Sequence, residues 1–293
     1  MFKRIITAFV GILILLPFVI FSDTPAGLVL SVVMACVGVY EILKCVGKGK
    51  NIYLLVLVEA YAFSVQILSR YVESNVFLSC ITLMTVVLFA LIMAGAVFTA
   101  GQPTDAEPGE GNKIRVHRIT LSQAAIASIM TVYISFGFSS LVLLRDIEHN
   151  GMILFLMWFF IPWLCDAMAY FTGRAFGKHK LIPAVSPKKT VEGAVGGVIG
   201  TLVIMMIFAL AMQLGFGYKP NYFGILLLTL ICCPVSMCGD LIASLIKREY
   251  GIKDYGKLFP GHGGVMDRFD SCISTGPFIY IVCVLFSSNA LFY

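Results

Sequence analysis

Long apolar runs, separated by short polar segments, extend along the whole chain. A helix needs about 20 apolar residues to cross the roughly 30 Å hydrocarbon core of a bilayer. Runs of this length predict membrane-spanning helices at 5–22, 27–43, 52–69, 76–98, 120–144, 151–171, 191–213, 222–246 and 272–291. Within lipid, a helix satisfies its own backbone hydrogen bonds. We therefore predict an all-α fold, a polytopic transmembrane bundle of about nine helices.

The composition excludes an ordinary soluble domain. The chain is 59% hydrophobic and 13% charged, with a mean hydropathy of +0.93, whereas soluble domains are about 25% charged. Its nine cysteines lie almost entirely within or at the ends of apolar runs and form no C-x-x-C pair. They are therefore interpreted as small packing residues rather than zinc ligands.

The basic residues predict the orientation. With nine crossings and a cytoplasmic N-terminus, 18 of the 21 Lys and Arg residues fall on the cytoplasmic side, and only Arg70, Arg145 and Lys219 fall outside. This is the asymmetry of the positive-inside rule. Together with attraction to anionic lipids, it explains the net charge of +5 without a nucleic-acid partner. Lys3 and Arg4 precede the first run as in a signal peptide, but the eight later spans favour an uncleaved helix.

Three regions follow from the spacing of the runs. Residues 1–98 form a four-helix membrane region with short loops, and residues 99–119 form a Gly- and Pro-containing cytoplasmic linker. Residues 120–293 form a C-terminal membrane region with two charged cytoplasmic loops, which we interpret as catalytic. The first residues of the span 191–213 include two overlapping pairs of glycines four residues apart, Gly193 with Gly197 and Gly196 with Gly200. These pairs predict close helix packing.

The first charged loop combines a helical stripe with a possible anion site. Asp166, Tyr170 and Arg174 are spaced four residues apart and share one face of the span 151–171 as it leaves the membrane. An acid at this depth is costly unless it is paired or functional. It could pair with Arg174 or act at a site.

Downstream, Ser186 and Pro187 suit the N-cap and first position of the next helix. Lys188 and Lys189 then fall in its first turn, where a cation opposes the helix dipole unless an anion binds there. With Thr190 nearby, the segment predicts a phosphate site.

The second charged loop carries acids, bases and glycines together. Asp240, Ser244 and Lys247 share one helical face, and Arg248 lies beside them. After this face come Lys257, His262, Gly263 and Gly264, and then Asp267, Arg268 and Asp270. Glycines allow a backbone to approach a ligand closely. Carboxylates hold Mg²⁺, which takes further ligands from substrate phosphates, and Lys and Arg neutralise the remaining phosphate charge.

The stretch from Ser244 to Asp270 resembles a family motif. It reads Ser-x-Ile-Lys-Arg-x4-Lys-Asp-x-Gly-x2-Phe-x2-His-Gly-Gly-Val-x-Asp-Arg-Phe-Asp. This pattern is similar to that of the phosphatidate cytidylyltransferases, or CDP-diacylglycerol synthases. The segment Ser-Pro-Lys-Lys-Thr-x-Glu-Gly at 186–193 is also similar to the family. The resemblance covers roughly residues 120–293, and the first hundred residues match only in hydropathy.

The resemblance implies a reaction and its partners. CTP and phosphatidate, the latter held in the bilayer, would give CDP-diacylglycerol and pyrophosphate for phospholipid biosynthesis, with Mg²⁺ and a membrane-embedded homodimer. Acids matching the family's metal site are Asp240 and Asp267, and Asp166 and Asp270 are further candidates for one or two metal ions. The predicted catalytic residues are Asp240, Asp267, Lys247, Arg248, His262 and Arg268. The predicted substrate-binding residues are Ser186, Lys188, Lys189, Thr190, Ser244, Lys257, Gly263 and Gly264.

Because CTP is cytosolic and the phosphatidate headgroup is interfacial, we expect the site on the cytoplasmic face of the cell membrane. Two alternatives remain at this stage. A CTP-dependent polyprenol or dolichol kinase would release CDP instead of pyrophosphate. An ion-coupled transporter would use Asp166, Glu59 and Asp240 as coupling acids near the midplane, but most acids and bases gather at one face.

Overall fold

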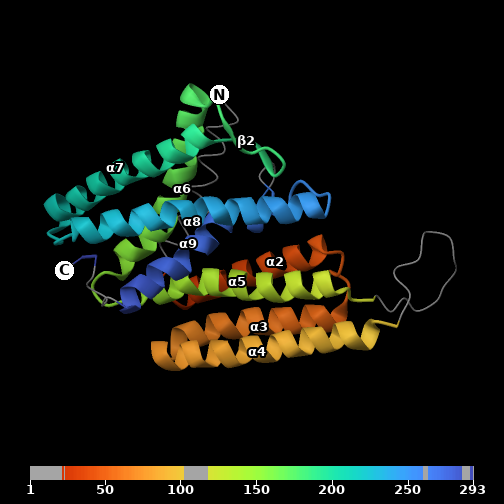
Figure 1. The fold of residues 1–293 in the computed structure, drawn as a ribbon. Helices are drawn as coiled ribbons and strands as arrows, with labels where there is room; N and C mark the ends of the chain where they lie inside the picture. The colour runs from red at the N-terminus through yellow and green to blue at the C-terminus, as the bar shows by residue number, and fades with distance from the viewer. Residues whose placement is uncertain (1–21, 23, 102–117, 260–262, 286–290, 293) are drawn as a thin grey trace.

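The computed structural model describes residues 22, 24–101, 118–259, 263–285 and 291–292. Within them lie eight long helices and one two-stranded antiparallel sheet (Figure 1). The elements are α2 Pro25–Cys45, α3 Ile52–Tyr71, α4 Ser74–Thr99, α5 Leu121–Arg145, α6 Gly151–Phe176, β1 Lys180–Ile182, β2 Ser186–Thr190, α7 Val191–Phe216, α8 Tyr222–Glu249 and α9 Met266–Leu285.

The predicted helical membrane bundle is confirmed for the described part of the chain. All eight helices are long and apolar enough to cross a membrane. Each matches one predicted span, while the first predicted span, 5–22, lies almost entirely outside the described residues. Most of the predicted linker, residues 102–117, also lies outside them.

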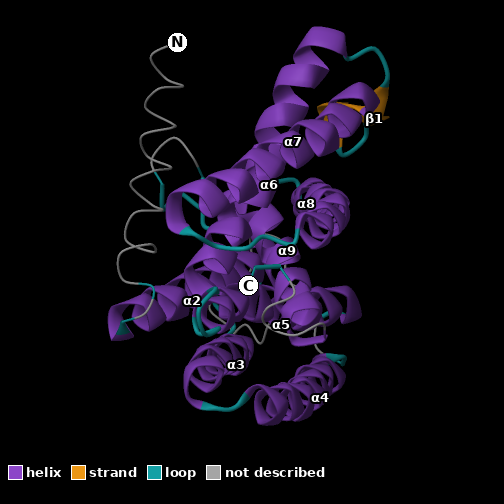
Figure 2. Ribbon diagram, turned by 90° about the vertical axis from the view of Figure 1, so that its left-hand side faces the viewer, coloured by secondary structure: helices purple, strands orange, loops and turns teal. Residues whose placement is uncertain are grey.

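Helix α5 lies at the centre of the bundle, where it packs against α2, α3, α4, α6 and α9. Helices α3 and α4 lie on one side of the bundle and α6, α7 and α8 on the other, with α9 between (Figure 2). In α5, 72% of the most apolar stretch is buried, against 22% in α4 and in α7. The exposed residues of these outer helices are largely apolar, as expected for surfaces that face lipid rather than water.

The chain alternates between two ends of the bundle, and the basic residues gather at one of them. We call this the charged end; it comprises the C-terminal ends of α2, α4, α6 and α8 and the N-terminal ends of α3, α5, α7 and α9. Of the described Lys and Arg residues, only Arg70, Arg145 and Lys219 lie at the opposite end. The structure therefore has the charge asymmetry from which the orientation is predicted.

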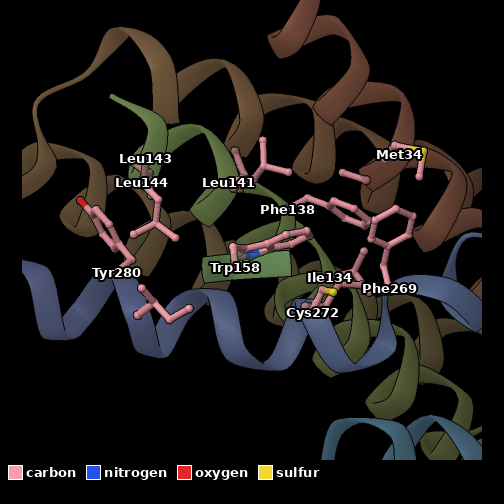
Figure 3. Close-up of a cluster of buried hydrophobic side chains, with 14 of the residues drawn as sticks. Met34, Ile134, Phe138, Leu141, Leu143, Leu144, Trp158, Phe269, Cys272 and Tyr280 are labelled. Atoms are coloured by element: carbon pink, nitrogen blue, oxygen red, sulfur yellow. The ribbon is translucent and has the colours of Figure 1, made fainter. Parts of the chain in front are cut away.

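An aromatic cluster joins three helices in the core (Figure 3). Phe138 of α5 lies 6.4 Å from Trp158 of α6 and 5.6 Å from Phe269 of α9, measured between ring centroids. All three side chains are fully buried. The indole Nε1 of Trp158 donates a hydrogen bond of 3.0 Å to the hydroxyl of Ser140. This core holds the first turns of α9, where Asp267 and Asp270 lie, against α5 and α6.

The close packing predicted from the glycines at the start of α7 is confirmed, and the structure shows that the partner is α6. A Cβ atom at Gly193 would lie 2.8 Å from the carbonyl oxygen of Ala169. One at Gly197 would lie 3.0 Å from the carbonyl oxygen of Cys165. Since both oxygens belong to the α6 backbone, side chains at these positions would separate the two helices.

Two predicted boundaries were wrong. Helix α7 does not begin at Ser186-Pro187: residues 186–190 form β2, which pairs with β1, and Thr190 is the N-cap of α7. The Thr190 hydroxyl accepts a hydrogen bond of 3.1 Å from the Gly193 backbone. Helix α9 begins at Met266 rather than at 272. The polar residues before 272 are helical because their side chains form hydrogen bonds within the bundle, as Asp267 and Asp270 do.

The glycines also provide a stability prediction. At Gly137 of α5, an added Cβ would lie 2.8 Å from the carbonyl oxygen of Ile273 in α9, whereas at Gly215 of α7 it would meet nothing within 4 Å. Alanine favours a helix over glycine by about 1 kcal/mol. We expect Gly137→Ala to lower the melting temperature in detergent and Gly215→Ala to leave it equal or higher. Equal melting temperatures for both variants would contradict the packing described for α5 and α9.

Candidate active site

A cavity of about 400 Å³ opens at the charged end, between α6, β2, α7 and α8. It brings together the two charged segments that the sequence separates by about fifty residues. Its polar lining includes Asp166, Tyr170 and Arg174 from α6, Lys188 and Lys189 from β2, and Asp240 from α8. The predicted helical stripe on α6 therefore faces this cavity. Ser186, Thr190 and Gly193 also line it.

Lys189 and Asp240 form the polar centre of the cavity. The Lys189 Nζ atom lies 2.5 Å from Asp240 Oδ2. This Nζ atom is buried and donates no well-oriented hydrogen bond within the described part of the chain. The Ser244 hydroxyl donates a bond of 3.3 Å to the other oxygen of Asp240. Lys189 therefore keeps N–H donors for a ligand, as a phosphate-binding lysine needs.

Two further carboxylates, Asp166 and Asp270, lie near this pair. Asp166, Asp240 and Asp270 lie close enough to repel one another electrostatically. Ser271 holds two of them: its hydroxyl donates to Asp166 Oδ2 at 3.1 Å, and its backbone N–H donates to Asp270 Oδ1 at 2.8 Å. Among the described residues, Asp166 and Asp270 form no ion pair within 4.0 Å. The cluster therefore carries an excess of negative charge.

Asp267 has a different environment from these three acids. Its Oδ2 atom accepts backbone N–H bonds from Tyr255 at 2.8 Å and Gly264 at 2.9 Å. Its Oδ1 atom accepts a bond of 2.8 Å from Lys247 Nζ, and the carboxylate is almost fully buried. Three N–H donors already occupy the side chain, so Asp267 organises the loop between α8 and α9.

Tyr255 joins this loop to α8. Its hydroxyl donates a hydrogen bond of 2.7 Å to the Ala243 carbonyl of α8, and Lys247 Nζ lies 5.2 Å from the ring centroid. Burial raises the pKa of the Tyr255 phenol well above its ordinary value, so the hydroxyl stays protonated and keeps this bond. Gly263 has a positive φ of 89°, a conformation that favours glycine and turns the loop into α9.

The remaining predicted site residues are distributed as follows. Lys188, Arg248, Lys257 and Arg268 are exposed at the charged end, where they could meet phosphate groups. The hydroxyl of Thr190 is engaged as the α7 N-cap. Gly264 is buried, with its N–H on Asp267. His262 lies outside the described residues.

The donor set fits a magnesium ion that shares its coordination with a substrate. In the described part of the chain, no group of three or more His, Cys, Asp and Glu side chains is already arranged to hold a metal ion. Mg²⁺ in nucleotide sites, however, takes one or two carboxylates, several waters and substrate phosphates. Asp240 with Asp166 or Asp270 supplies such a pair. A divalent cation would also offset their mutual repulsion.

Sequence reasoning missed two residues of this site. Glu41 of α2 accepts backbone N–H bonds at the start of α9, next to Asp267, and Tyr255 donates its backbone N–H to Asp267. The position of Glu41 carried one signal, since an acid in an apolar helix is rare and commonly functional. Its partners lie more than 220 residues away, so no local pattern could identify them.

Comparison with known proteins finds similarity over most of the chain. A model of the cytidylyltransferase family matches residues 2–286. A phosphatidate cytidylyltransferase of Bacillus subtilis is 38% identical over 168 residues, which cover 57% of this chain and 61% of the relative. A phosphatidate cytidylyltransferase of Haemophilus influenzae is 43% identical over 155 residues, which cover 49% of this chain and 54% of the relative. The matched regions thus span less than two thirds of the length of these relatives.

Proposed function

This chain belongs to the cytidylyltransferase family, and on that premise we propose that it transfers the cytidylyl group of CTP to phosphatidate, giving CDP-diacylglycerol and pyrophosphate. The observation that carries the proposal is the cavity in which the buried, donor-bearing Lys189 lies beside the carboxylates of Asp166 in α6 and Asp240 in α8. The names of the relatives from Bacillus subtilis and Haemophilus influenzae support the choice of phosphatidate as acceptor.

The nucleophile in this reaction is the phosphate group of phosphatidate. A phosphate monoester loses its second proton near pH 6, so it is largely dianionic at about pH 7 and needs no strong general base. Its oxygen forms a bond to the α-phosphorus of CTP, and the bond from that phosphorus to the bridging oxygen of pyrophosphate breaks. The main obstacle is repulsion between two anions, so the protein must position and neutralise them.

The residues of the cavity meet these two needs. Arg174, Lys188 and Lys189 offer N–H donors to phosphate oxygens in the cavity. Asp240, with Asp166 or Asp270, would hold Mg²⁺ beside them. When bound, Mg²⁺ would polarise the phosphoryl oxygens and stabilise the charge that develops on pyrophosphate. Lys247 is kept at the edge of this group by Asp267.

The position of the cavity suits both substrates. It lies at the charged end of an integral membrane protein, and by the positive-inside rule that end faces the cytoplasm. CTP would enter from the cytosol, while the acyl chains of phosphatidate would remain in lipid beside α6 and α7. The homodimer and the binding of anionic lipids stay predictions.

The products distinguish this function from a lipid kinase and from a transporter. We expect purified protein to release pyrophosphate from CTP only when phosphatidate and Mg²⁺ are both present, with one CDP-diacylglycerol formed per pyrophosphate. A matched reaction with dolichol in place of phosphatidate should give no product. Release of CDP with a phosphorylated lipid would contradict the proposal, as would substrate uptake into proteoliposomes without CTP turnover.

A further inference from the structure

Glu41 is a buried carboxylate that the proposed reaction does not use. It lies in the last turns of α2, in the N-terminal region whose role the sequence leaves open, and only 5% of its surface is exposed. A charged group in such a position is costly unless hydrogen bonds compensate for the lost water. The partners of Glu41 therefore indicate what its charge stabilises.

Both oxygens of Glu41 bind the start of α9. Oε1 accepts a hydrogen bond of 3.1 Å from the Val265 backbone, and Oε2 accepts one of 2.9 Å from the Met266 backbone. The first N–H groups of a helix have no partner within the helix and carry partial positive charge. Glu41 thus caps α9 from a different helix, one residue away from Asp267.

Two loop segments close around the same carboxylate. A Cβ atom added at Gly256 or at Gly264 would collide with Glu41 Oε1. The Phe259 N–H donates a bond of 2.9 Å to the Gly263 carbonyl, which joins the same two stretches of the loop. Asp267 bonds to Tyr255 and Gly264 on these stretches. The loop is therefore held by two carboxylates, Asp267 from α9 and Glu41 from α2.

We propose that Glu41 is a positioning residue for the active site: its carboxylate fixes the α8–α9 loop and the first turn of α9, and through them the geometry of Asp267 and Lys247. The expected effect on catalysis rests on the proposed function. The expected effect on the structure of the loop does not. Adjacent backbone N–H groups, those of Gly264 and Val265, bond to Asp267 and Glu41 respectively. Loss of Glu41 would therefore free the segment that presents Asp267.

The first test compares Glu41→Gln with Glu59→Gln. Glu59 of α3 is a matched control, since it is a partly buried acid in the same region whose side-chain partner is Cys36. In Glu41→Gln, one amide oxygen remains but an NH₂ group replaces an acceptor opposite a backbone N–H. We expect kcat to fall about tenfold to a hundredfold, as small misplacements of catalytic groups do, with KM for CTP nearly unchanged.

Hydrogen exchange separates positioning from general destabilisation and from the reaction itself. We expect amides 263–267 to lose protection in Glu41→Gln, measured without substrate, while Glu59→Gln retains wild-type exchange, kcat and melting temperature. Wild-type exchange and wild-type kcat in Glu41→Gln would overturn the inference. If the wild-type protein forms no CDP-diacylglycerol, the proposed function fails, and the exchange data still decide whether Glu41 holds the loop.

A second pair of variants tests the same contact from the loop, and Gly264→Ala does so without changing Glu41. The three atoms nearest to a Cβ at Gly264 all belong to Glu41. Gly264→Ala alone should push against the carboxylate and increase exchange at 263–267. In Glu41→Ala this obstruction is absent, so the double variant should exchange no faster than Glu41→Ala alone. Effects that simply add would show that the two groups are independent, which would overturn the inference.

Discussion

Asp240→Asn is expected to lower the rate of CDP-diacylglycerol formation about a thousandfold, because a metal ion contributes several kcal/mol of charge stabilisation and each 1.36 kcal/mol is tenfold in rate. The Asp240 carboxylate lies in the cavity, accepts a bond from Ser244 and pairs with Lys189. An asparagine keeps the shape of the side chain but removes its charge. The variant would both weaken the metal site and leave Lys189 without its counter-ion.

The measurement is CTP-dependent formation of CDP-diacylglycerol in detergent micelles at saturating phosphatidate. The matched control is Asp146→Asn, which also removes a carboxylate from an ion pair, here with Arg70. Asp146 lies at the opposite end of the bundle, so this variant should retain wild-type activity. Equal losses in the two variants would point to a general effect on folding, and full activity in Asp240→Asn would remove Asp240 from the site.

Asp267→Asn is expected to reduce both activity and stability. Asp267 accepts two backbone N–H bonds and pairs with Lys247. An asparagine that accepts the two N–H bonds must direct its own NH₂ group toward the Lys247 ammonium. Breaking one side of a buried ion pair costs about 3–5 kcal/mol. We expect kcat to fall by about a hundredfold or more, as the loop geometry is lost.

The stability effect distinguishes Asp267 from Asp240. Asp267→Asn should lower the melting temperature in detergent and increase hydrogen exchange at residues 253–259 and 263–267, whereas Asp240→Asn should do neither to a comparable extent. Asp254→Asn is the control within the same loop, since Asp254 is exposed, and it should behave as wild type. A stable Asp267→Asn variant with normal exchange would contradict the bonding described for the loop.

The sequence predicts the helices well because lipid imposes a simple length requirement. Each described helix lies on a predicted span, and the glycine spacing correctly predicts close helix packing at the start of α7. The four-residue spacing of Asp166, Tyr170 and Arg174 correctly predicts that they share a face, which lines the cavity. These predictions are correct because each depends on the spacing of residues within a single helix, which can be read from the sequence.

The errors arise where contacts with other segments override the local preferences of the sequence. Ser186 and Pro187 satisfy the rules for a helix start, but pairing between β1 and β2 extends the backbone through them. Thr190, also a good N-cap residue, begins α7 instead. The interactions of Lys189 with Asp240 and of Glu41 with Val265 join distant segments. No spacing rule predicts such partners.

The separation of Asp267 from the other acids is also a tertiary result. The sequence places Asp267 and Asp270 three residues apart on one helical face. In the structure Asp270 faces Asp166 and Asp240, while Asp267 bonds to the loop and Lys247. The two acids of the motif therefore have different contacts: Asp270 belongs to the carboxylate cluster, and Asp267 bonds to the loop between α8 and α9.

We propose that the carboxylates of α6, α8 and α9 anchor a divalent cation beside the phosphates of CTP. Electron-nuclear double resonance of protein loaded with Mn²⁺ and CTP tests it most directly, because the ³¹P coupling reports phosphates that contact the metal. We expect this coupling in the wild type and in Asp146→Asn, and its loss in Asp240→Asn. An unchanged ³¹P coupling in Asp240→Asn would contradict the claim, as would Mn²⁺ bound to the wild type without any such coupling.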